Sequence, residues 1–186
     1  MDMKPYYKES DGKVVELEQQ DELYLLYKNI IELFIPDGFS FVKCVYNQLK
    51  ELIIPTGCEY VICSHNQLEK LIIPTGCERV ECEYNQLKEL VVPTGCKKII
   101  CYYNKLEKLI VSDGCEDVRC NNNKLKELII PTGCGYVLCT HNQLEKLIIS
   151  DNCRNVYCYN NQLKKLIIPN GCKKVDCNNN QLKKEW

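Results

Sequence analysis

Two consecutive stretches of the chain repeat almost the same nineteen letters. Residues 47–65 read NQLKELIIPTGCEYVICSH, and residues 66–84 read NQLEKLIIPTGCERVECEY. A fixed short period is the sequence signature of a repeat protein, in which every copy folds into one unit that stacks on the next. The first letter of the unit recurs without a slip at Asn47, Asn66, Asn85, Asn104, Asn123, Asn142, Asn161 and Asn180.

All fifteen cysteines occupy two positions of this unit. One column is Cys44, Cys63, Cys82, Cys101, Cys120, Cys139, Cys158 and Cys177; the other is Cys58, Cys77, Cys96, Cys115, Cys134, Cys153 and Cys172. Packed thiols, disulfides and thiolate metal sites are all open interpretations. Stacked strands hold in-register Cβ atoms about 4.8 Å apart, which exceeds the roughly 3.5 to 4.5 Å of a disulfide, and two parallel columns do not bring four ligands together tetrahedrally. We therefore expect free thiols that pack as small apolar side chains in a reducing compartment, with no metal and no cofactor.

The unit resembles a known repeat. From Cys58 to Leu68 it reads C-x-x-V-x-C-x-x-N-x-L. This is similar to the constant segment of the leucine-rich repeat family, L-x-x-L-x-L-x-x-N-x-L, with cysteine or valine in three leucine places. The next half, L-x-x-L-x-I-x-x-G at residues 68–76, resembles the short tandem-half variety of that family. Cysteine-rich units of nineteen residues also look similar to uncharacterised leucine-rich repeat proteins of giant DNA viruses, a resemblance that implies the host cytoplasm or a virus factory.

The resemblance covers residues 39–182 and implies a right-handed leucine-rich-repeat solenoid. The two similar halves of the unit predict short parallel strands on both sides of each coil, with little or no helix. A glycine column follows the recurring prolines, and its one replacement is Asn152. Gly and Asn adopt positive φ most readily, so we expect a left-handed corner there. We predict an N-terminal cap and divergent first coil at 1–38, the repeat array at 39–182 and a tail at 183–186.

Charge and hydropathy exclude several kinds of partner. The 186 residues include 24 basic and 25 acidic side chains. A nucleic acid normally needs a basic face, and we interpret the one local basic excess as a solvated end: Lys164, Lys165, Lys173, Lys174, Lys183 and Lys184. No apolar run approaches the roughly 18 residues that span a bilayer, and the N-terminal segment lacks the apolar part of a signal peptide. We expect a cytoplasmic protein with neither a membrane nor a nucleic-acid partner.

Nothing in the sequence indicates catalysis. The only two histidines, His65 and His141, share one column four coils apart, which is roughly 19 Å at the strand spacing. No phosphate-binding loop, nucleophile elbow or H-E-x-x-H motif is present. Buried thiols have no base to activate them. We therefore expect no enzyme activity.

The asparagine column has two interpretations. Its amides could form a ligand-contacting ladder, or they could satisfy backbone groups at a tight turn between coils. The second is favoured, because a tight turn leaves N–H and C=O groups that need partners. All eight asparagines are predicted to be structural.

The outward positions of the constant-segment strand vary while the inward positions repeat. Strand alternation places Val61 and Cys63 inside, and Tyr60, Ile62 and Ser64 outside. The family resemblance implies a module that holds a protein partner on this face, although unconstrained surface positions could also simply drift. The predicted partner-binding residues are Tyr60, Ile62, His65, Arg79, Glu81, Tyr84, Lys98, Ile100, Tyr102, Tyr103, Arg119, Tyr136, Leu138, His141 and Tyr157.

The second half of each unit has an apolar residue at an outward position. The column is Phe34, Ile53, Ile72, Val91, Ile110, Ile129, Ile148 and Ile167. Such a long apolar stripe is unusual on a soluble monomer. The alternative function is therefore structural self-association, as a homodimer or larger assembly, unless the proline-bounded corners turn these residues inward.

Charged pairs beside this column alternate in sign from coil to coil. They run Lys50-Glu51, Glu69-Lys70, Lys88-Glu89, Glu107-Lys108, Lys126-Glu127 and Glu145-Lys146, and the order ends in Lys164-Lys165 and Lys183-Lys184. Opposite charges on adjacent strands attract, with roughly 0.2 to 1 kcal/mol per pair. We interpret the alternation as control of the stacking register.

Overall fold

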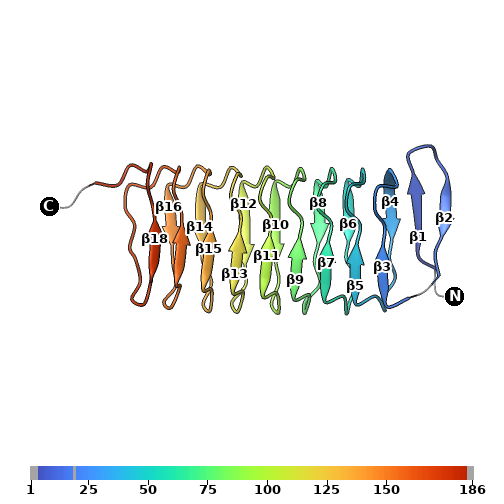
Figure 1. The fold of residues 1–186 in the computed structure, drawn as a ribbon, viewed down its shortest axis with the longest axis horizontal. Coiled ribbons are helices and arrows are strands. Elements are labelled where there is room, and N and C mark those ends of the chain that lie inside the picture. Colours follow the sequence, from blue (N-terminus) through green and yellow to red (C-terminus); the bar gives the residue numbers. More distant parts are fainter. Residues whose placement is uncertain (1–3, 19, 184–186) are drawn as a thin grey trace.

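The computed structural model describes residues 4–18 and 20–183, which form a nearly straight rod of stacked coils (Figure 1). These residues contain eighteen strands and no helix. The strands are β1 (Tyr6–Glu9), β2 (Val14–Glu16), β3 (Glu22–Tyr24), β4 (Ile30–Phe34), β5 (Phe41–Lys43), β6 (Glu51–Ile53), β7 (Tyr60–Ile62), β8 (Lys70–Ile72), β9 (Arg79–Glu81), β10 (Glu89–Val92), β11 (Lys98–Ile100), β12 (Lys108–Val111), β13 (Asp117–Arg119), β14 (Glu127–Ile129), β15 (Tyr136–Leu138), β16 (Lys146–Ile148), β17 (Asn155–Tyr157) and β18 (Lys174–Asp176).

One side of the rod is a continuous parallel sheet. Its nine strands lie in the order β18-β17-β15-β13-β11-β9-β7-β5-β3, and neighbouring strands pair in register at nineteen-residue steps, as in Val42↔Val61 and Val61↔Val80. The prediction of a repeat solenoid with parallel strands and no helix is thereby confirmed over the described residues.

The opposite side has strands too, but they pair only in twos. The pairs are β6-β8, β10-β12 and β14-β16, all parallel. These strands are short, and in most coils a proline such as Pro55 or Pro93 follows, which has no N–H to continue a ladder. The second sheet is interrupted between β8 and β10 and between β12 and β14, whereas the first is continuous.

The N-terminal segment covers one end of the stack. Strands β1 and β2 form an antiparallel sheet with β4, in the order β2-β1-β4, while β3 joins the nine-stranded sheet. The coil that carries β3 and β4 therefore continues the array. The division of the chain at residues 38 and 182 stays a prediction, and residues 184–186 of the expected tail lie outside the described residues.

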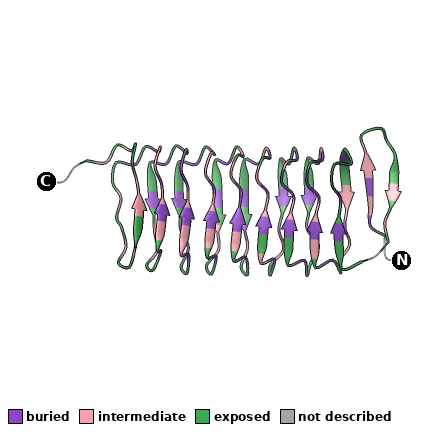
Figure 2. Ribbon diagram, viewed as in Figure 1, coloured by how far each residue is buried: buried purple, intermediate pink, exposed green. Residues whose placement is uncertain are grey.

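The core is a set of columns between the two sides. Leu49, Val61 and Cys63 are fully buried, as are their counterparts in the central coils; in most strands the middle residue is buried and the flanking residues are more exposed (Figure 2). All fifteen cysteines are free thiols; thirteen are buried, and Cys172 and Cys177 of the last coil are half-buried. Burial of one leucine contributes roughly 1.5 to 3 kcal/mol, and cysteine fills inward positions where no helix widens the coil.

Each coil has a corner at the position of the glycine column. The glycine column has positive φ throughout the described coils, for example 85° at Gly57 and 89° at Gly76, and Asn152 takes the same conformation at 69°. The left-handed corner predicted there is present.

The asparagines join neighbouring coils by hydrogen bonds. The Asn66 amide donates to the carbonyl oxygens of Cys44 (2.8 Å) and Cys63 (3.2 Å), and its Oδ1 accepts from the Leu49 N–H (3.1 Å). Asn85, Asn104, Asn123, Asn142, Asn161 and Asn180 donate in the same way. Each amide therefore spans two coils, and its polar atoms are used by the backbone.

Candidate interaction surfaces

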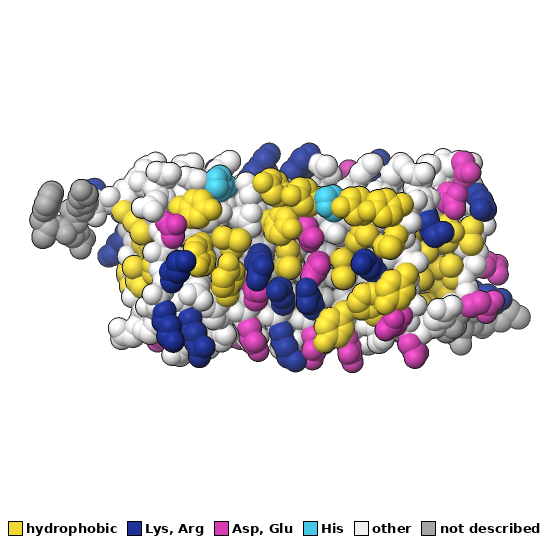
Figure 3. Space-filling model, viewed as in Figure 1, with side chains coloured by type: hydrophobic (Ala, Val, Ile, Leu, Met, Phe, Trp, Pro, Cys, Tyr) yellow, Lys and Arg dark blue, Asp and Glu magenta, His cyan; other side chains and the backbone are white. Residues whose placement is uncertain are grey.

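The variable face is the outward side of the nine-stranded sheet. In Figure 3 basic, acidic and hydrophobic side chains are mixed across one side of the rod, and both histidines lie along one long edge. Tyr60 is 39% exposed and Arg79 is exposed, whereas Ile62, Glu81 and Leu138 are half-buried. Side chains of very different chemistry thus share a rigid, regularly spaced scaffold.

A connected network occupies the middle of this face. Asp117 pairs with Lys98 (3.0 Å) on one side and with Arg119 (3.0 Å) in its own strand. The Arg119 guanidinium carbon lies 5.0 Å from the centre of the Tyr136 ring, and that ring lies 5.7 Å from the ring of Tyr157. Five side chains from four neighbouring coils are therefore already held in place by their mutual contacts.

For two residues, Ile100 and Ser64, the predicted exposure on the outward face is wrong. Ile100 is only 9% exposed, because it lies in register between Glu81 and Arg119, which flank it on both sides. Ser64 is only 6% exposed, and it lies beyond the end of β7 at Ile62, where the alternation of a strand no longer applies. Neither residue offers a free surface to a partner.

A stack of rings runs along the edge of the variable face. Tyr27, Tyr46, His65, Tyr84 and Tyr103 lie nearly parallel, with centroid separations of 4.5, 4.3, 4.4 and 4.8 Å and interplanar angles of 10° to 12°. The ring of Tyr102, which belongs to the same predicted set, meets Tyr84 and Tyr103 edge-on. The structure thus gathers four of the predicted residues, His65, Tyr84, Tyr102 and Tyr103, in one cluster.

Every ring of the stack stands on a left-handed backbone. The φ angles are 54° at Tyr27, 56° at Tyr46, 53° at His65, 56° at Tyr84 and 50° at Tyr103. A bulky residue with positive φ is strained by roughly 1 to 3 kcal/mol, and each stacked pair returns about 0.5 to 1.5 kcal/mol. The sequence analysis missed both this second corner and Tyr27, although the nineteen-residue recurrence of an aromatic residue directly before the asparagine could have indicated them.

Toward the C-terminus, the positions equivalent to the stacked rings carry mostly asparagine instead of tyrosine. Asn122, His141, Asn160 and Asn179 also have positive φ. The Asn160 amide lies 2.8 Å from His141 Nε2, and the Asn179 amide donates to Asn160 Oδ1 (2.8 Å). His141 is therefore part of an amide ladder, apart from the aromatic cluster that contains His65.

The apolar ladder lies on the interrupted side of the rod. Seven of its eight residues, Ile53, Ile72, Val91, Ile110, Ile129, Ile148 and Ile167, are exposed by 42% to 70%. The proline corners do not turn them inward. Phe34 differs, since it is half-buried and its ring stacks on Tyr6 of β1 at 5.6 Å.

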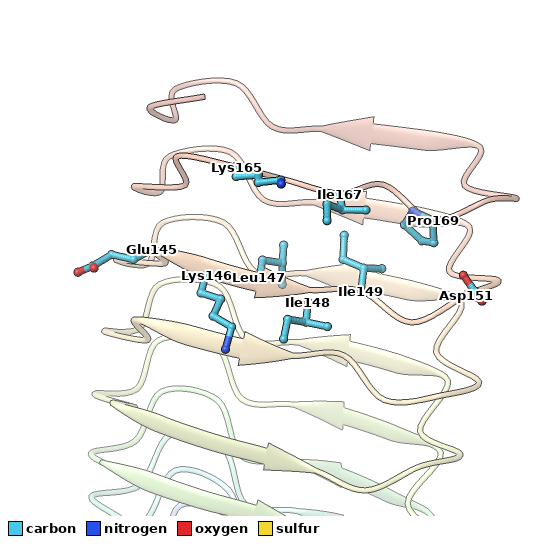
Figure 4. Close-up of a pocket in the computed structure, with 9 residues that line it drawn as sticks. All are labelled: Glu145, Lys146, Leu147, Ile148, Ile149, Asp151, Lys165, Ile167 and Pro169. Carbon is cyan, nitrogen blue, oxygen red and sulfur yellow. The ribbon is translucent and has the colours of Figure 1, made fainter. Parts of the chain in front are cut away.

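Grooves open where the second sheet is interrupted. Figure 4 shows one of about 460 Å³ between β16 and the following segment, lined by Ile148, Ile149, Ile167 and Pro169, with Lys146 and Lys165 beside them. Another, of about 260 Å³, lies between β8 and β10. Both grooves are apolar and open along the ladder.

The alternating charges form ion pairs between coils of this side. Lys70 pairs with Glu51, and Lys146 pairs with Glu127 at 2.5 Å. The registers Glu51↔Lys70, Glu89↔Lys108 and Glu127↔Lys146 belong to the three strand pairs. All six side chains are exposed, so each pair contributes little, at most about 1 kcal/mol.

Burial raises the pKa of every thiol of the first cysteine column from Cys44 to Cys158. Burial raises the pKa of Cys44 and Cys120 to about 12, so these sulfurs stay protonated at neutral pH. Among the residues that the structure describes, no group of three or more His, Cys, Asp or Glu could hold a metal ion. Within the same part of the chain, no helix has the length and hydropathy to cross a membrane.

Two solved structures resemble the rod over most of its length. "Novel Molecular Architecture of YopM-a Leucine-rich Effector Protein from Yersinia pestis" has a TM-score of 0.62 at 23% identity and covers 79% of this chain and 51% of that one. YopM from Yersinia enterocolitica WA-314 has a TM-score of 0.58 at 19% identity and covers 84% of this chain and 41% of that one. The chain has the fold of these leucine-rich proteins. It spans about half of their length or less, and no family model and no curated protein matches the sequence.

Proposed function

We propose that the protein is a non-catalytic interaction module that presents the variable face to a protein partner. The observation that supports this is the pre-formed network of Lys98, Asp117, Arg119, Tyr136 and Tyr157. Side chains that are already ordered lose little freedom on binding, and arginine and tyrosine are the residues most often found at the centre of protein interfaces. The leucine-rich effector protein of the same fold agrees with a role in interaction.

Affinity capture from a cytoplasmic extract tests this proposal. The bait variant is Arg119→Glu with Tyr136→Ala, and the matched control is Lys124→Glu, an exposed site outside the predicted set. Wild type and control should enrich the same protein, and the Arg119/Tyr136 variant should lose it while its circular dichroism is unchanged. Equal enrichment by all three would contradict the proposal.

We place the protein in a reducing cytoplasm, which is the host cytoplasm if the resemblance to proteins of giant viruses reflects its origin. The buried, unpaired thiols support this, because disulfides form mainly in oxidising compartments. Alkylation during cell lysis, followed by denaturation without reductant and mass analysis, should count fifteen modified cysteines. A count far below fifteen would contradict a reducing location.

Self-association through the apolar ladder is the second candidate function. The exposure of seven aliphatic side chains in one line favours it, since large exposed apolar patches mark interaction sites. Ile110→Lys combined with Ile129→Lys should abolish assembly. Unchanged assembly of that variant would remove the ladder as the interface.

A further inference from the structure

A row of charged side chains borders the apolar ladder, and its signs alternate along the rod. When this row is placed against a second copy of itself running in the opposite direction, opposite charges face each other. Each charged residue lies two residues before a ladder residue in the same short strand, so both point outward on one face. From coil to coil they read Glu51, Lys70, Glu89, Lys108, Glu127 and Lys146, all exposed. Because the signs alternate over an even number of coils, the series read backwards presents a lysine opposite every glutamate.

A two-fold symmetric dimer would use this charge complementarity at its interface. In a symmetric dimer the same patch meets itself, so residue i faces residue j and j faces i. With the axis along the strands and midway between the coils of Val91 and Ile110, the coil order of the second copy is reversed. The ladder then meets itself, and the facing charges are Glu51 with Lys146, Lys70 with Glu127, and Glu89 with Lys108.

Registers centred on a coil are unfavourable, whereas an axis midway between two other coils still opposes unlike charges but overlaps fewer coils. An axis through the coil of Val91 would place Lys70 against Lys108, and every other register centred on a coil also pairs like charges. The column on the far side of the ladder agrees with the midway register, because Thr94 faces Asp113 and Thr75 faces Thr132, with no like charges opposed. The alternation of charge signs therefore favours dimer registers in which the two-fold axis lies between two coils.

We propose that a second copy of this chain binds on the apolar ladder, with the two rods antiparallel and the two-fold axis between the coils of Val91 and Ile110. This inference rests on self-association, the second candidate function above, and adds the partner's orientation and register. Each charge keeps its neighbour within the chain and gains an opposite charge across the interface.

The size of the contact predicts its strength. Eight coils at about 4.8 Å and a width of roughly 15 Å give about 580 Å² per copy, or about 1,150 Å² in total. That is the lower limit of specific interfaces, so we expect a dimer with a dissociation constant in the micromolar range that weakens as salt is added.

Two charge-swapped variants test the register, because both exchange one glutamate and one lysine and keep the net charge. Glu51→Lys with Lys146→Glu restores the contact across the proposed interface but breaks the ion pairs within each chain. Glu51→Lys with Lys70→Glu restores the pair within the chain but places like charges across the interface. Sedimentation velocity over a concentration series measures dimer affinity, and thermal melting reports the effects within the chain.

We expect the Glu51/Lys146 swap to melt lower than wild type yet dimerise within about threefold of it. The Glu51/Lys70 swap should melt like wild type and dimerise at least about tenfold more weakly, since four like-charge contacts replace four attractions. The opposite ranking, or equal weakening of both, would overturn the register while self-association stands, provided that Ile110→Lys with Ile129→Lys abolishes the dimer. A wild type that stays monomeric at millimolar concentration would overturn both.

Discussion

The hydrogen bonds of the asparagine ladder allow the loss of stability on removal of one side-chain amide to be predicted. In Asn104→Ala the Leu87 N–H loses its acceptor, Asn104 Oδ1 at 3.0 Å. The carbonyl oxygens of Cys82 and Cys101 each lose one donor but keep a second, because each also accepts from the neighbouring asparagine of the ladder. One buried N–H without a partner and two weakened carbonyls should lower the free energy of unfolding by about 1 to 3 kcal/mol.

Urea unfolding followed by circular dichroism measures this change. A loss of that size lowers the melting temperature of a chain of this length by about 2 to 4 °C per kcal/mol. Asn180→Ala is the matched control: both asparagines are half-buried, but Asn180 lies in the last coil, where Cys172 and Cys177 are also only half-buried, so its loss should cost clearly less. The reasoning is refuted if Asn104→Ala unfolds like wild type, or if Asn180→Ala costs as much.

Two further predictions concern the corners and the thiols. Gly95→Ala should destabilise more than Gly57→Ala, because a Cβ at Gly95 would lie 2.9 Å from Gly76 Cα, whereas one at Gly57 meets nothing within 4 Å; equal midpoints in urea would contradict this. The folded chain should also lose stability in alkali. Burial raises the pKa of Cys44 and Cys120 from 9.0 to about 12, so their contribution is complete below pH 9 and is lost as the pH rises toward 12. At pH 10 the loss is about 1.4 kcal/mol for each such thiol, and Cys44→Val with Cys120→Val should reduce it. A pH dependence between 8 and 10 that the double variant leaves unchanged would contradict the assignment.

The period of the sequence was enough to predict the architecture. A nineteen-residue repeat with apolar residues in fixed columns leaves one way to bury them, which is to stack the coils in register. The Gly column with its single Asn152 indicated the left-handed corner, because few residues adopt that conformation. These features depend on residues that recur in every unit, so they can be predicted from the sequence of a single unit.

The surfaces were harder to predict, because they depend on neighbouring coils. Alternation predicts an outward direction for Ile100 and Ser64, but Ile100 is covered by its neighbours in register and Ser64 lies beyond the end of β7. The ring stack was missed since tyrosine and histidine rarely adopt positive φ, and the strain at Tyr84 is offset only by the rings above and below it.

The variable face and the apolar ladder have separate proposed roles, and the molar mass in solution tests this separation most directly. Light scattering under reductant, across a concentration series, would compare wild type, Arg119→Glu with Tyr136→Ala, and Ile110→Lys with Ile129→Lys. Wild type and the variable-face variant should rise together from 21.7 kDa toward twice that mass, and the ladder variant should stay at 21.7 kDa. One mass for all three proteins at every concentration, or loss of the dimer in the variable-face variant alone, would contradict this assignment.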